Sequence, residues 1–229
     1  MLKPIIFLVC LLPLFRLIGL GFMDRMGANP VEFVTRSTGT WTLVLLCVTL
    51  AVTPVRRIFG WNALQRHRRM LGLFAFFYAS LHLTTYVWLD QWFEFSSVAR
   101  DIYKRPFITV GFAAFVLMLP LALTSNQWSM KQLGRNWGKL HRLVYLVAIA
   151  ALLHYFWHKG GKNNYNEPLA YAGLVAFLFV VRMVFWWRAR AQNRASLVSG
   201  QARAATTHQS TRKPTTPGGE LPSHVPRQP

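Results

Sequence analysis

The sequence predicts an all-α integral membrane protein, a bundle of six transmembrane helices followed by a disordered C-terminal tail. Hydrophobic residues make up 53% of the 229 residues, and charged residues only 14%. Soluble domains usually carry about 25% charged residues. The apolar residues also gather into six long blocks, and the last block ends shortly before residue 190. These observations exclude a soluble enzyme and a small secreted module.

Each block is about 15 to 20 residues long, close to the ~20 residues with which a helix crosses a ~30 Å hydrocarbon core. None of them shows the alternation of a membrane strand. We expect the second block to extend to Gly39 and the fourth to Arg105. In chain order the blocks are Ile5–Phe22, Trp41–Val55, Met70–Leu89, Phe107–Leu123, Leu140–Trp157 and Leu169–Trp187.

Proline residues stand near the edges of the blocks. Because the residue before a proline avoids helical geometry, we expect these prolines to mark helix boundaries. The four segments are Gly27–Pro30, Thr53-Pro54, Arg105-Pro106 and Glu167-Pro168. No internal repeat is evident in the sequence.

The charge of the chain is strongly basic, with 26 Lys and Arg, 7 Asp and Glu, and a net charge of +19. Such a balance suggests nucleic acid first, but the apolar blocks argue against that partner. With the N-terminus inside, 17 Lys and Arg fall on the cytoplasmic side and 7 on the outer side. The positive-inside rule therefore predicts that both termini are cytoplasmic.

The first block is predicted to be a retained span. Pro13 and Arg16 interrupt its apolar run, and no small-residue cleavage site follows promptly. A cleaved signal peptide remains the alternative. Cys10 and Cys47 both lie inside apolar blocks, which excludes a disulfide framework and a cysteine metal site.

Composition divides the chain into two parts. Residues 1–190 form the predicted transmembrane domain. From about Gln192 the chain is rich in Ala, Ser, Thr, Gln, Gly and Pro. Such a segment buries too little apolar surface to offset its ordering entropy. Residues 191–229 are therefore predicted to be a disordered cytoplasmic tail.

Two histidines lie deep in the third and fifth blocks. At ~1.5 Å per residue, His82 stands roughly 16 Å above Leu71, and His154 roughly 21 Å above Leu140. An ionisable residue at such depth is a functional hypothesis by default. Two imidazoles at matched depth on two helices suit a haem iron with two axial histidines. The alternative is a pair of buried histidines that bond to neighbouring helices without a cofactor.

Two further histidines flank the fifth block. His141 precedes His154 by thirteen residues, or about 220° on an ideal helix, so the two do not share a face. His158 shares the face of His154, but it stands at the boundary beside Lys159, where we expect a headgroup-level role. A proton-coupled transporter would place Asp or Glu near such histidines. None of the six blocks has either residue in its interior.

Three segments carry a resemblance to a known family. They are residues 69–83, residues 133–146 and His154–Trp157, and the likeness extends from about Gly19 to Arg188. The chain resembles the haem-binding membrane subunits of the bacterial protein-methionine-sulfoxide reductase system, the MsrQ family.

The resemblance implies a ferric-reductase-like bundle of six helices in the bacterial inner membrane, with haem b and FMN as cofactors. It implies electron transfer from a cytoplasmic flavin reductase or the quinone pool to a periplasmic molybdopterin-containing partner, MsrP, which reduces methionine sulfoxide in envelope proteins. By the same resemblance, His82 and His154 match the axial ligands of the haem iron, and His141 matches a third cofactor-binding histidine. The chain would then be an electron-transfer subunit, with no catalytic residue of its own.

The chain departs from the wider superfamily, which places two histidines on each of two helices. Fourteen residues before His82 the chain has Arg68, and His67 is one residue away from that place. We therefore expect one haem and a second carrier near His141, either flavin or quinone. A proton-coupled transporter and a scaffold subunit, both without haem, remain alternative hypotheses.

Overall fold

The structure, a computed structural model, describes residues 2–160 and 165–210, and no strand occurs among them. Six of its helical segments are long and apolar enough to cross a membrane, which confirms the predicted fold class. The elements are α1 (Leu2–Phe22), α2 (Pro30–Phe59), α3 (Leu64–Thr85), the π-helical turn η1 (Tyr86–Asp90), α4 (Phe95–Lys104), α5 (Pro106–Leu123), α6 (Gln127–Leu133), α7 (Arg135–Leu140), α8 (Leu143–Gly160) and α9 (Asn166–Ser210).

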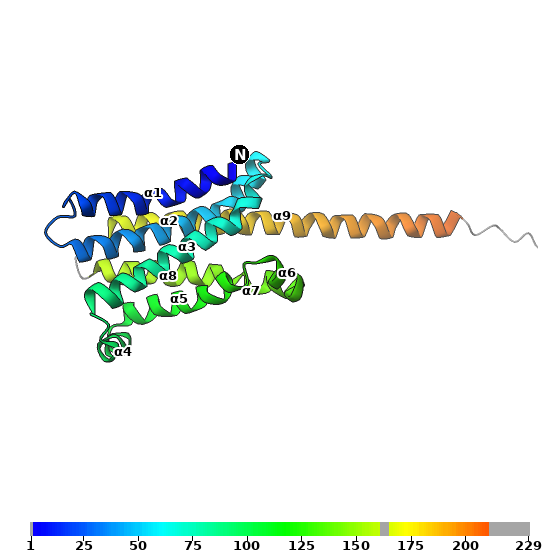
Figure 1. Ribbon diagram of the computed structural model, residues 1–229. Coiled ribbons are helices and arrows are strands. Elements are labelled where there is room, and N and C mark those ends of the chain that lie inside the picture. Colours follow the sequence, from blue (N-terminus) through cyan, green and yellow to red (C-terminus); the bar gives the residue numbers. More distant parts are fainter. Residues whose placement is uncertain (1, 161–164, 211–229) are drawn as a thin grey trace, which may run out of the picture. The chain divides into compact units, whose positions relative to one another are not determined.

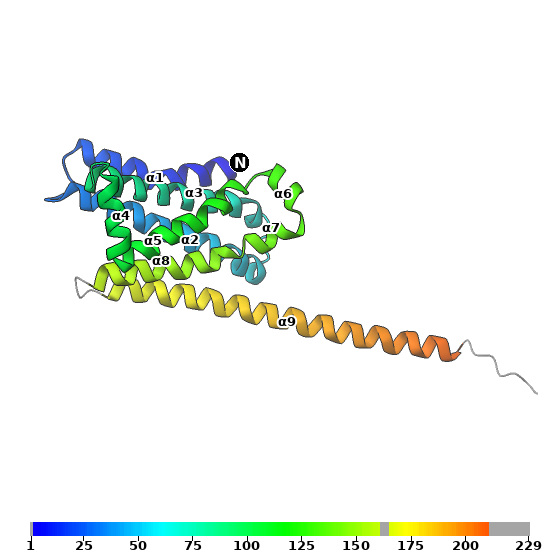
Figure 2. The same cartoon turned by 90° about the horizontal axis from the view of Figure 1, so that it is seen from below.

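The chain divides into two compact units, Met1–Arg182 and Met183–Pro229, and the first unit holds the helix bundle (Figure 1). Within it α2 packs along α3, and α5 packs along α8, as both views show (Figure 2). Contacts of α3 with α5 and of α2 with α8 join the two pairs, while α1 lies against α2 and α3. The centre of the bundle is lined by buried side chains that include Leu50, Ala75, Tyr78, Val147 and Ala148.

The second span is much longer than its apolar block. Asn29 caps α2 by accepting the Glu32 N–H at 3.0 Å, and Pro30 occupies the first turn, as expected of a boundary. Pro54, however, lies inside α2. The prediction that Thr53-Pro54 marks a helix end is therefore wrong.

A partner from a distant helix explains why Pro54 is tolerated. Proline has no N–H, so the carbonyl of Leu50, four residues earlier, loses its helical partner. The Arg182 guanidinium donates to that carbonyl from α9. Its other terminal nitrogen donates to the Tyr145 hydroxyl at 2.6 Å. A tertiary hydrogen bond thus replaces the one that the proline removes.

Pro13 also lies inside a helix, α1, and a side chain from α3 contacts the backbone next to it. The Tyr78 hydroxyl, from α3, donates to the Cys10 carbonyl at 2.8 Å and accepts the Leu14 N–H at 3.2 Å. It inserts between two backbone groups that would otherwise bond to each other in a regular helix. This contact ties α1 to α3.

The fifth block is broken rather than continuous. Helix α7 ends at Leu140, α8 begins at Leu143, and His141 lies in the turn between them. The projection of about 220° between His141 and His154 assumed one unbroken helix and therefore does not apply.

The structure also differs from the sequence prediction in the last helix. Helix α9 continues to Ser210, through residues that the composition predicts to be disordered. No proline interrupts the chain between Pro168 and Pro214, and alanine and arginine there favour helix. Residues 211–229, the rest of the predicted tail, lie outside the described residues, and the boundary at residue 190 stays a prediction.

Candidate functional site

The structure brings together the two histidines that the sequence singles out. His82 projects from α3 and His154 from α8, and their ring centroids are 6.0 Å apart with an interplanar angle of 75°. The two helices belong to different pairs of the bundle, so the contact lies where the α2–α3 and α5–α8 pairs meet.

Each imidazole is anchored to the backbone of a neighbouring helix. His82 Nδ1 donates to the Thr35 carbonyl of α2 at 2.8 Å, and His154 Nδ1 donates to the Phe107 carbonyl of α5 at 2.7 Å. Because a carbonyl can only accept, each Nδ1 carries the ring proton. Each Nε2 then keeps its lone pair for a metal. A histidine that binds a metal through one nitrogen usually donates the N–H of its other nitrogen to a carbonyl or carboxylate in this way.

A glycine makes room for each ring. Gly39 and Gly111 come one helical turn after the accepting carbonyls. A Cβ at Gly39 would lie 3.0 Å from His82 Cε1, and one at Gly111 would lie 2.6 Å from His154 Nδ1. Both rings therefore pack directly on the neighbouring backbone, and the closer approach is at Gly111.

The two halves of the site are related by a constant offset in the chain. Each position of the first half has its counterpart 72 positions later in the chain. The pairs are Thr35 and Phe107, Gly39 and Gly111, and His82 and His154. The correspondence is structural and rests on these three pairs of positions. A repeated Gly-to-His spacing of 43 residues was the available signal. The spacing is hard to recognise in the sequence because the rings bond to backbone carbonyls. Any residue provides such a carbonyl, so Thr35 and Phe107 need not be alike.

The comparisons with known proteins identify the family of the chain. Residues 38–152, which include His82 and most of both helix pairs but end two residues before His154, match the family model described as ferric reductase like transmembrane component. A relative from Bordetella pertussis is 55% identical over 192 residues, which cover 84% of this chain and 93% of the relative. One from Herminiimonas arsenicoxydans is 51% identical over 196 residues, covering 85% and 90%. Both carry the name protein-methionine-sulfoxide reductase heme-binding subunit MsrQ.

The chain belongs to the MsrQ family. A third relative, from Ralstonia nicotianae, is 53% identical over 196 residues, covering 85% of the chain and 89% of the relative. No solved structure matches this member of the family.

The third histidine lies apart from the facing pair in this MsrQ-family chain. The ring of His141 stacks on Trp137, with centroids 3.9 Å apart and an interplanar angle of 26°. Its Nδ1 lies 3.2 Å from the Trp137 carbonyl, and its Nε2 lies 3.4 Å from the Ser125 hydroxyl. The structure therefore places His141 at the end of the bundle near α6 and α7. Its contacts there are with Trp137 and Ser125 rather than with His82 or His154.

The place of a fourth histidine holds a guanidinium. Arg68 lies near Arg182 and Tyr145. Near the facing pair, the Phe107 ring lies between His154 and His158, at centroid distances of 6.0 Å and 5.8 Å. His158 therefore flanks the pair, one turn beyond His154.

The donor set fits a haem better than a bare metal ion. Over residues 2–160 and 165–210, no group of three or more His, Cys, Asp or Glu side chains could hold a metal. A porphyrin leaves its iron needing only axial ligands, which histidine commonly provides. Two facing imidazoles with free Nε2 atoms meet that need.

Proposed function

We propose that the chain is the b-type cytochrome membrane subunit of a methionine sulfoxide reductase system. It would pass electrons across the bacterial inner membrane, from a cytoplasmic flavin reductase or quinol to a periplasmic molybdopterin-containing subunit, MsrP. That partner would reduce methionine sulfoxide in envelope proteins. The names of the relatives and the facing pair of His82 and His154 support this proposal.

The observation that carries the proposal is the anchoring of both imidazoles. His82 and His154 are the residues that would hold the haem iron. The Thr35 and Phe107 carbonyls hold both rings in the Nε2-ligating tautomer. The haem, when bound, supplies a reversible one-electron change. Both rings are partly buried in the bundle, and such burial would influence the potential of a bound haem.

A second carrier is part of the proposal. With Arg68 in place of a fourth histidine, the chain offers axial ligands for one haem. We place FMN or a quinone near His141, on the side from which electrons would enter. The stacked rings of Trp137 and His141 offer a flat aromatic surface at that end.

The described residues favour electron transfer over a proton-coupled transporter. Proton relays in membranes usually combine histidine with Asp or Glu in the interior of the spans. In the part of the chain that the structure describes, Glu32 and Glu167 lie in the first turns of α2 and α9, and Asp90 ends η1. Both histidine rings donate to backbone carbonyls, while Asp101 and Glu167 accept from the hydroxyls of Tyr86 and Tyr155.

Reduced-minus-oxidised absorption spectra of the purified chain test the proposal. We expect the signature of a low-spin b-type haem in the wild type, with the haem content measured as pyridine haemochrome. His82→Ala and His154→Ala should each lose most of the haem, while His158→Ala should keep it. A chain that purifies folded and without haem, or variants of the pair that keep it, would contradict the proposed function.

The role of the partner needs a separate assay. The purified chain alone should not reduce methionine sulfoxide with any electron donor. Activity should appear only after addition of the periplasmic subunit. Reduction by the isolated chain would mean that it is a catalyst in its own right.

A further inference from the structure

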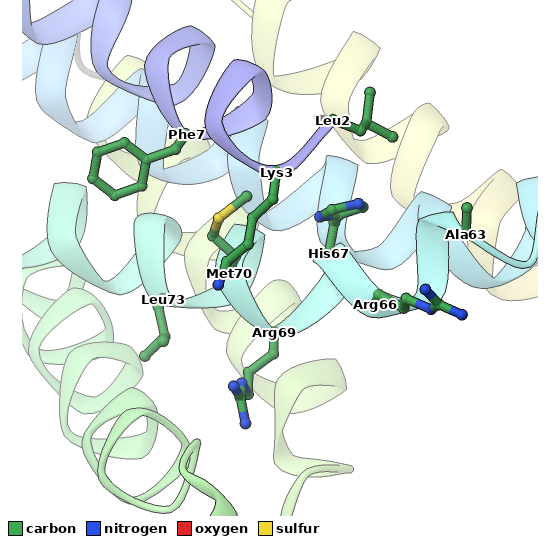
Figure 3. Close-up of a pocket in the computed structure, with 9 residues that line it drawn as sticks. All are labelled: Leu2, Lys3, Phe7, Ala63, Arg66, His67, Arg69, Met70 and Leu73. Atoms are coloured by element: carbon green, nitrogen blue, oxygen red, sulfur yellow. The ribbon is translucent and has the colours of Figure 1, made fainter.

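A cavity of about 710 Å³ lies between the first turns of α1 and α3, away from the histidine pair (Figure 3). Its volume falls within the range of about 300–1,000 Å³ that is typical of small-molecule sites. Lys3 extends from α1 toward α3 and ends beside Met70, while Arg69 projects from α3 away from α1 and Arg66 projects toward the Ala63 end of the helix. The lining residues are Leu2, Lys3, Phe7, Ala63, Arg66, His67, Arg69, Met70 and Leu73.

The polar part of this lining is basic. Lys3, Arg66 and Arg69 contribute three cations, His67 adds an imidazole, and the lining includes no carboxylate. Three like charges around one cavity repel each other unless an anion lies among them.

The protein does not provide that anion within the described segments. Their carboxylates all belong to the opposite end of the bundle, where α1 ends and where α2, α5 and α9 begin (Figure 1). The ion pairs there use the carboxylates of Glu32, Asp101 and Glu167. The six carboxylate residues are Asp24, Glu32, Asp90, Glu94, Asp101 and Glu167.

The lining also changes from charged to apolar along the helix axes. Lys3 lies in the first turn of α1, and Phe7 lies four residues, or about 6 Å, deeper. On α3, Leu73 lies seven residues, or about 10 Å, beyond Arg66. Both helices are membrane spans, so the charges lie at the surface of the bilayer and the apolar walls point into it.

We propose that this cavity binds an anionic phospholipid. The phosphate lies among Lys3, Arg66 and Arg69, and an acyl chain runs along Phe7, Met70 and Leu73. Basic pockets between transmembrane helices bind anionic headgroups in this way. A soluble phosphate would use the cations but leave the apolar walls unused. The proposal does not depend on haem binding.

Native mass spectrometry of the delipidated full-length chain tests the proposal, with phosphatidylglycerol and phosphatidylcholine as probes. The test variant is Lys3→Gln/Arg66→Gln/Arg69→Gln. The matched control, Lys131→Gln/Lys139→Gln/Arg142→Gln, removes the same charge from the same end of the bundle but outside the cavity. Each basic residue near an anionic lipid contributes about fivefold in affinity. We expect the test variant to bind phosphatidylglycerol about 100-fold more weakly, and the control to bind it like the wild type.

Three outcomes would overturn the proposal. The first is equal binding of the two lipids by the wild-type chain, and the second is an equal loss in the test and control variants. The third is displacement of phosphatidylglycerol by millimolar inorganic phosphate or FMN, which would assign the site to a soluble phosphate. If the test variant fails to fold, the wild-type comparison of the two lipids and the competition still decide.

Discussion

His82 and His154 face each other across the bundle with ring centroids 6.0 Å apart, although 72 residues separate them in the chain. Each ring is held by a backbone carbonyl and packs on a glycine of the neighbouring helix. The histidines therefore depend on two features outside their own helices. One of these, the glycine, can be tested by mutation without changing either histidine.

Gly111→Ala should weaken haem binding more than Gly39→Ala. A Cβ at residue 111 would lie 2.6 Å from His154 Nδ1, so the ring must leave the Phe107 carbonyl. At residue 39 the closest approach is 3.0 Å, which a smaller shift of His82 relieves. Loss of the hydrogen bond that orients a metal-binding histidine typically costs 10–100-fold in metal affinity. We expect Gly111→Ala to fall in that range and Gly39→Ala at its lower end, measured by haem titration of the apoprotein.

Gly72→Ala provides the matched control. Its Cβ would meet Thr49 Cγ2 at 3.7 Å, an ordinary contact, in the middle of the same bundle. This variant should bind haem as the wild type does. Equal losses in all three variants would show that the bundle, rather than the imidazole rings, is sensitive to added methyl groups.

His141→Ala should keep the haem and slow its reduction. The His141 ring stacks on Trp137 beside Ser125, and it makes no contact with the facing pair. Its removal should therefore leave the reduced-minus-oxidised spectrum unchanged. Stopped-flow reduction by a flavin reductase or a quinol should become slower. A loss of haem equal to that of His82→Ala would instead make His141 a ligand.

Six spans and the pairing of two histidines could be predicted from the sequence. Span length and hydropathy are properties of a single segment, so each apolar block revealed its helix without reference to the others. The matched depth of His82 and His154 likewise followed from helical rise within two separate blocks. Both predictions needed only local information.

The features that were mispredicted or missed depend on distant partners. Pro54 is tolerated inside α2 because Arg182 bonds to the carbonyl that the proline leaves free, that of Leu50, 132 positions away from Arg182. His141 lies in a turn between α7 and α8 rather than within one continuous helix. Gly39 and Gly111 matter through rings on other helices. No local pattern states which helix will be the neighbour.

The orientation of the chain is a further prediction. An excess of Lys and Arg on one side predicts cytoplasmic termini. Alkaline phosphatase, which is active only in the periplasm, should be inactive when fused after Arg188 and active when fused after Asn163. The opposite pattern would reverse the orientation and exchange the two sides for electron entry and exit.

Arg182→Leu should destabilise the bundle, and Pro54→Ala should reduce that cost. Without the guanidinium, the Leu50 carbonyl has no partner in the interior of a span. Hydrogen bonds to charged groups contribute about 1.5–3 kcal/mol. Alanine at position 54 provides an N–H for the same carbonyl, so part of the loss should be recovered. Unfolding of the four proteins of this double-mutant cycle should give a coupling energy of about 1 kcal/mol or more.

The coupling must be specific to the proline next to Arg182. Pro120 lies inside α5, and Arg182 has no contact with it among the hydrogen bonds of the described residues. Pro120→Ala should therefore add to Arg182→Leu without coupling. The Tyr145 hydroxyl also loses a partner in Arg182→Leu, so Tyr145→Phe measures that share separately. Equal coupling energies of Pro54→Ala and Pro120→Ala with Arg182→Leu would contradict this interpretation. The guanidinium would then not compensate for the proline, and it would stabilise the bundle through Tyr145.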